Sequence, residues 1–139
     1  MNRLLLAAVL AVAACDAPSS PEAAATQKAQ LADARGTCVK LFERQRACSA
    51  EFIPALVDVR RGLDKPAGIA KANRDELIAA AFAEWKSDST DEAIGNTCDR
   101  MAGKLPPPAV ETARGCIAAG PCGEFVTCVT PLVRAQLGQ

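Results

Sequence analysis

The stretch TCVKLFERQRACSAEF, residues 37–52, decides the fold class of this chain. Apolar side chains and two cysteines recur in it at helical spacing, which places them on one face of an α-helix. This face carries Cys38, Leu41, Phe42, Gln45, Cys48 and Phe52. The charged side chains fall mostly on the opposite face. The stretch therefore predicts a helix that begins after Gly36, with Thr37 as its N-cap.

Five further helices are predicted from proline, glycine and capping signals. They are expected from about Pro54 to Arg61, from Asn73 through Trp85, from Ser89 through Met101, after the prolines at 106–108, and from about Pro121, with a kink or break at Pro131. The core-facing side chains of the helix after Asn73 are expected to be Leu77, Ile78, Ala81, Phe82 and Trp85. We therefore expect an all-α domain of five or six short helices.

The N-terminal segment has the parts of an export signal. Arg3 provides a positive charge, residues 4–12 form an apolar run, and small residues lead to Cys15. The run is too short for a bilayer core, which needs about 20 apolar residues. The stretch VAAC at 12–15 resembles the lipobox of bacterial lipoproteins. The resemblance implies cleavage before Cys15 and lipidation of its sulfur, and two or more acyl chains make membrane anchoring stable. The alternative is an ordinary secretory signal cut near Ala14, with a free thiol left at Cys15.

Six cysteines follow Cys15, and they predict how the domain is cross-linked. They are Cys38, Cys48, Cys98, Cys116, Cys122 and Cys128. An even number in a small exported domain predicts three disulfides, although fifteen pairings stay open. A metal–thiolate cluster is the alternative, and it would need reduced thiolates in an oxidising compartment. The predicted organisation is a signal peptide at 1–14, a lipidated cysteine and flexible tether at 15–30, and a disulfide-bonded helical domain at 31–139.

Missing residue types exclude several chemistries. The chain has no histidine and no tyrosine. Catalysis by Ser-His-Asp or Cys-His needs an imidazole, and haem attachment at C-x-x-C-H needs a histidine, so all three are excluded. No C-x-x-C pair is present to begin a zinc or thioredoxin-like site. Without Arg3 the mature chain has 15 basic and 16 acidic residues, a formal net charge of −1, and no basic stripe supports nucleic-acid binding. We expect no cofactor and no enzymatic activity.

Three features are candidate sites, each with a structural alternative. Asp88, Asp91 and Glu92 form the densest acidic cluster, but they lack the alternating ligands and central glycine of an EF-hand loop. A solvated loop with a helix cap explains them without metal. Trp85, the only tryptophan, is expected in the core, whereas an exposed Trp85 would anchor a partner. The prolines at 106–108 can form a rigid connection or a polyproline ligand.

The chain as a whole resembles small cysteine-rich bacterial lipoproteins. This resemblance predicts a protein of the bacterial cell envelope, held to the inner or outer membrane by lipid on Cys15. We expect a non-enzymatic role, either binding another envelope protein or serving as a structural part. The alternative is a secreted enzyme or inhibitor of unfamiliar type that uses carboxylates or a labile disulfide. An exposed apolar groove around Trp85 would favour the binding protein, and a deep pocket with converging carboxylates would favour the enzyme.

Overall fold

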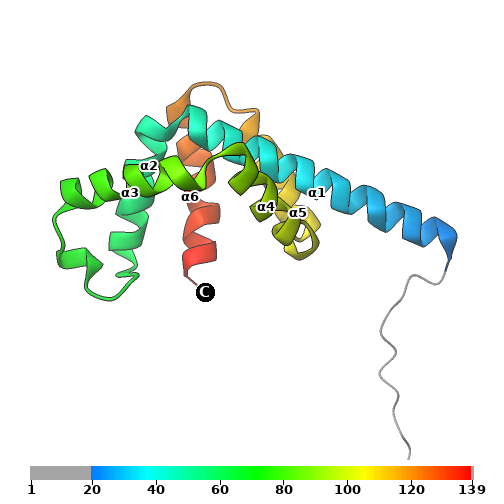
Figure 1. Ribbon diagram of the computed structural model, residues 1–139, viewed down its shortest axis with the longest axis horizontal. Coiled ribbons are helices and arrows are strands. Elements are labelled where there is room, and N and C mark those ends of the chain that lie inside the picture. The colour runs from blue at the N-terminus through cyan, green and yellow to red at the C-terminus, as the bar shows by residue number, and fades with distance from the viewer. Residues whose placement is uncertain (1–19, 139) are drawn as a thin grey trace, which may run out of the picture.

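The computed structural model describes residues 20–138, which are mostly helical (Figure 1). The α-helices are α1 (Pro21–Ala47), α2 (Ser49–Gly62), α3 (Arg74–Asp88), α4 (Asp91–Met101), α5 (Pro107–Ile117) and α6 (Cys122–Leu137). Two short 3₁₀ helices, η1 (Ile69–Lys71) and η2 (Ala102–Lys104), lie in the connections. No strand forms in the described part of the chain. The prediction of an all-α domain is confirmed.

Three disulfides cross-link the helices, as the sequence predicts. Cys38 of α1 is bonded to Cys98 of α4, Cys48 at the α1–α2 corner to Cys122 of α6, and Cys116 of α5 to Cys128 of α6. The Cα–Cα distances are 5.6, 5.3 and 5.4 Å. These distances lie within the usual range for disulfides.

The helices form two halves. In the first half α4 and α5 lie along α1, and in the second half α3 and α6 lie along α2. Each half has its own cluster of buried side chains. The cluster of the first half consists of Cys38, Ile94 and Cys98. The cluster of the second half consists of Cys48, Phe52, Ile53, Cys116, Phe125 and Val129. Cys116 reaches the second cluster from α5, so it belongs to both halves.

Helix α1 is longer than the sequence predicts. It begins at Pro21, where the Oγ of Ser20 accepts a hydrogen bond from the Ala23 N–H (3.2 Å). Thr37, the predicted N-cap, is instead buried inside the helix. Residues 21–30, predicted to be part of a flexible tether, are helical because alanine and polar residues favour helix and no proline follows Pro21 in α1.

Only the start of α1, residues 21–26, extends beyond the other helices (Figure 1). Further along, Leu31 lies beside Gly103 of η2, and Asp33 forms an ion pair with Arg114 of α5 (2.7 Å). The predicted signal peptide, Cys15 and the tether at 15–19 lie outside the described residues.

Two internal prolines interrupt the helices less than predicted. Helix α2 begins at Ser49 and contains Pro54, which the sequence predicts as its start. Helix α6 continues past Pro131 to its end at Leu137. Leu132 and Val133 pack against the same cluster as the residues before Pro131. Burial of these two side chains stabilises the helix beyond the proline.

The starts of α4 and α5 follow the local sequence signals to within a residue or two. Thr90, and not Ser89, is the N-cap of α4, and its Oγ1 accepts a hydrogen bond from the Ala93 N–H (3.2 Å). Helix α5 begins at Pro107, within the proline run at 106–108. Proline suits the first helical position because its missing N–H would have no partner there.

Candidate functional site

Trp85 lies near the end of α3, at the edge of the second cluster, and is half-buried. Its indole stacks on Phe42 of α1 with ring centroids 6.2 Å apart, and it meets Phe52 of α2 at a tilt, 5.7 Å away. The indole N–H is buried, and no acceptor among residues 20–138 bonds to it. A buried donor without a partner costs about 1–3 kcal/mol. Trp85 therefore packs on the core, as expected, while one polar group on it stays unsatisfied.

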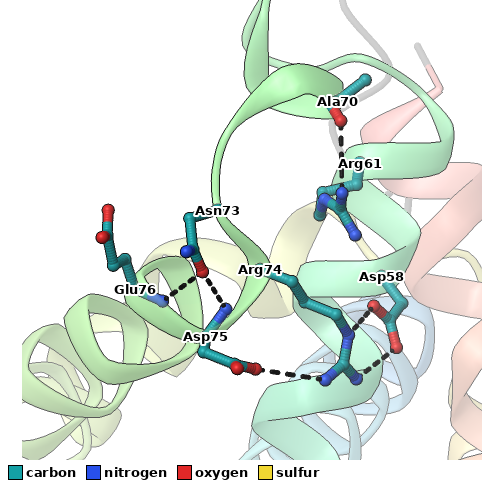
Figure 2. Close-up of polar contacts among 7 residues, drawn as sticks. All are labelled: Asp58, Arg61, Ala70, Asn73, Arg74, Asp75 and Glu76. Carbon is teal, nitrogen blue, oxygen red and sulfur yellow. Dashed lines mark hydrogen bonds and ion pairs between the residues drawn. The ribbon is translucent and has the colours of Figure 1, made fainter.

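No residue of α3 is fully buried, and the helix is held by half-buried side chains, Ala81 and Trp85 among them, and by polar contacts at its start. At its start Arg74 donates two hydrogen bonds to the Asp58 carboxylate of α2 (2.7 and 2.8 Å), as Figure 2 shows. These bonds lower the pKa of Asp58 and raise that of Arg74. Nearby, Arg61 donates to the Ala70 carbonyl (3.2 Å), and Asn73 caps α3 as predicted by accepting two backbone N–H bonds (2.9 and 3.3 Å). Trp85 provides the attachment at the other end.

A hollow of about 600 Å³, called the outer hollow here, lies on one side of Trp85. Its lining residues are Arg46, Ser49, Phe82, Trp85, Lys86, Ser89 and Thr90. Phe82 is 37% exposed, so the prediction that it faces the core is wrong. Helix α3 instead turns Ala81 and Trp85 toward the second cluster, which leaves Phe82 on the surface.

A second hollow of about 580 Å³, the inner hollow, lies among α2, α3 and α4. Part of its lining is apolar and includes Phe42, Ile53, Leu56 and Trp85. Four charged residues also line it, namely Arg60, Arg100, Glu84 and Asp88. The two carboxylates are four residues apart on α3 and therefore share a helix face. The inner hollow offers apolar surface together with charges of both signs.

The predicted acidic cluster is divided among different contacts. Asp91 forms an ion pair with Arg46 (2.7 Å), which also donates to the Ser89 carbonyl (2.9 Å). Asp88 lines the inner hollow, and Glu92 lies in the first turn of α4, where a carboxylate is favourable to the helix dipole. Within residues 20–138 no three His, Cys, Asp or Glu side chains are grouped so that they could hold a metal ion.

The six bonded cysteines differ in exposure, which the sequence does not predict. Cys38, Cys48, Cys98 and Cys116 are at most 5% exposed, Cys122 is half-buried, and Cys128 is exposed. Phe125 and Val129 of α6 are buried, whereas Cys128 is exposed although its Sγ is bonded to the fully buried Cys116.

No family model matches this chain, and comparisons with curated proteins and with solved structures find no match either. Over residues 20–138, no helix has both the length and the apolar character of a membrane span. Function is therefore inferred from the residues of this chain alone.

Proposed function

We propose that this chain is a lipoprotein of the bacterial envelope, anchored through Cys15, whose helical domain binds another envelope protein. The observation that supports the binding role is the aromatic pair on α3. Phe82 is exposed, and Trp85 is half-buried between the outer and inner hollows. Aromatic anchors surrounded by shallow, water-excluding contacts dominate the binding energy of many protein interfaces.

The chemistry of this face suits a protein partner. Full burial of a phenylalanine contributes about 1.5–3 kcal/mol, and because Phe82 is 37% exposed, covering it would add about a third of that to association. A partner carbonyl that reached the indole N–H of Trp85 after a small shift would recover its missing hydrogen bond. Lys86 lines the same outer hollow and adds a positive charge. Together these groups offer one apolar contact, one donor and one charge.

The inner hollow supports the alternative, an enzyme or inhibitor that uses carboxylates. Glu84 and Asp88 lie there with Arg60 and Arg100, and such groups could act on a polar substrate. This alternative predicts an activity that is lost in Glu84→Gln or Asp88→Asn. Binding through the aromatic pair predicts instead that both variants keep the partner.

Co-purification from detergent-solubilised envelopes tests the binding role, with the anchored full-length protein as bait. Phe82→Asp should lose the partner, because it places a charge in the outer hollow. Leu31→Asp is the matched control: Leu31 is 41% exposed on α1, against 37% for Phe82 on α3. Thermal melts of both variants check that each still folds. A partner that Phe82→Asp retains, or that both variants lose equally, would contradict binding through this face.

A further inference from the structure

The Cys116–Cys128 disulfide differs from the other two in what it joins. One of the others lies within the first half, between α1 and α4, and the second fixes α6 to the start of α2. The Cys116–Cys128 bond instead connects α5 of the first half to α6 of the second. Among residues 20–138 it is the disulfide that crosses between the halves.

Of the three disulfides, this one contains the most exposed cysteine residue. Cys128 is exposed, although its partner Cys116 is fully buried. Both cysteines of the α1–α4 bond are buried, and the α2–α6 bond joins a buried to a half-buried cysteine. Thiol–disulfide exchange begins when a thiolate approaches one sulfur of the bond, so its rate depends on access to that sulfur. The exposure of Cys128 therefore favours attack there.

The helices on either side of this bond have other contacts that hold them. Helix α5 lies along α1 and buries Val110 and Ala113, and helix α6 lies along α2 and buries Phe125 and Val129. Arg44 of α1 donates hydrogen bonds to two carbonyl groups in the α5–α6 connection, and its guanidinium lies 5.6 Å from the centre of the Phe125 ring. Breaking the disulfide would leave these contacts in place, so it would loosen the contact between the two halves without unfolding either half.

We propose that Cys116–Cys128 is a thiol-exchange site, opened by a protein or small-molecule dithiol. A thiolate of the dithiol attacks the Sγ of Cys128, a new S–S bond forms there, and Cys116 leaves as a thiolate that takes up a proton. The second thiol of the reductant then attacks its own sulfur in the mixed disulfide and releases Cys128 as a thiol. Two electrons pass to the protein, and the dithiol becomes a disulfide.

Exchange at this bond alters the contact between the halves. Cys116 packs in the second cluster with Phe125 and Val129, so its release removes the covalent tie that holds α5 against that cluster. The other two disulfides still cross-link each half internally. The reduced protein is a folded domain in which α5 moves more freely against α6. The inference stands on the disulfides alone and is independent of the aromatic face of α3.

Partial reduction locates the first bond to open. The full-length chain carrying Cys15→Ser is treated with increasing dithiothreitol, blocked with N-ethylmaleimide and digested with trypsin without further reduction. Cys116, Cys122 and Cys128 share the tryptic peptide 115–134, Cys48 lies in 47–60, and Cys38 and Cys98 lie in 36–40 and 87–100. The first labelled product should be peptide 115–134 that carries two maleimides and is still bonded to peptide 47–60. It should form at least about tenfold faster than labelled peptide 36–40. Earlier labelling of 36–40 or 47–60, or loss of all three bonds together, would overturn the proposal.

Amide hydrogen exchange tests the structural consequence. Cys116→Ala/Cys128→Ala should keep a cooperative thermal transition, and amides of α5 should exchange at least about tenfold faster than in the parent, with α2 unchanged. Cys38→Ala/Cys98→Ala is the control, and it should speed exchange in α4 rather than selectively in α5. Equal acceleration in every helix, or none in α5, would show that this bond does not control the contact between the halves.

Discussion

Removing the Cys48–Cys122 bond should cost more stability than removing the Cys116–Cys128 bond. The two sites are well matched, because Cys48 and Cys116 are both buried in the second cluster and their partners are both less buried. Replacing each pair by alanine thus removes similar packing. What differs is the length of chain that each bond closes, with sequence separations of 74 and 12.

The expected difference follows from the entropy that each bond removes from the unfolded chain. For separations of 74 and 12 residues, loop closure corresponds to about 4.4 and about 2.8 kcal/mol at 25 °C, a difference of about 1.6 kcal/mol. For a domain of this size that difference corresponds to roughly 6 °C in Tm. Small domains have about 5–15 kcal/mol of stability in total. Loss of the bond that closes the shorter loop should therefore leave the domain folded, whereas loss of all three bonds should remove most of its stability.

Urea unfolding followed by circular dichroism measures this difference. Both double-alanine variants carry Cys15→Ser, so no other thiol is present. Each free energy is extrapolated to zero urea with the variant's own m-value, because opening the longer loop exposes more surface in the unfolded chain. Cys48→Ala/Cys122→Ala should be the less stable variant. If the two variants lose equal stability, or if Cys116→Ala/Cys128→Ala loses more, restriction of the unfolded chain does not set the contribution of these bonds.

Three further predictions concern the core, the acid response and the anchor. Ile53→Ala should lower the free energy of unfolding by roughly 2–4 kcal/mol in urea titrations, whereas the exposed Leu31→Ala should change it by less than about 0.5 kcal/mol. The hydrogen bonds from Arg74 lower the pKa of Asp58 in the folded state. The contribution of Asp58 to stability is therefore fully present above its pKa in the unfolded chain, about 3.9, and is lost as the pH falls through its lower pKa in the folded protein. Asp58→Asn should therefore flatten the pH dependence of stability in that acid range, and an unchanged slope would contradict it. Cys15→Ser should abolish fatty-acid labelling and release the mature protein from the membrane fraction, and persistent labelling would exclude the lipid assignment.

Helix ends with strong local signals are predicted well from the sequence. Asn73 caps α3, and the prolines at 106–108 open α5, because capping and proline geometry act over a few residues. The start of α1 is missed for the same reason. Gly36 and Thr37 look like a helix start locally, but the helix that begins at Pro21 runs through them. A local signal does not show whether the preceding segment is already helical.

The candidate site is harder to predict, because it depends on how each helix is rotated about its axis. Phe82 lies next to Ala81, and Cys128 next to Val129, yet in each pair one residue is buried or half-buried at the cluster and the other is exposed. Neighbouring positions differ by about 100° around a helix, and both fit an apolar stripe drawn from spacing alone. Packing between helices decides which one is buried. The same is true of the disulfide pairing, which needs the arrangement of the helices that carry the cysteines.

Because the exposed start of α1 is helical, its length in residues determines the direction in which the domain faces. Residues 21–26 continue without a break into the part of α1 that packs against η2, α4 and α5. One residue inserted within 21–26 would turn the domain by about 100° relative to whatever precedes Pro21 and move it by about 1.5 Å. Seven inserted residues would move it by about 10 Å and turn it by only about 20°. The reach of the domain and the direction in which it faces can therefore be varied separately in this chain. Under the proposed anchoring through Cys15, a partner fixed in the same membrane would distinguish the two kinds of insertion.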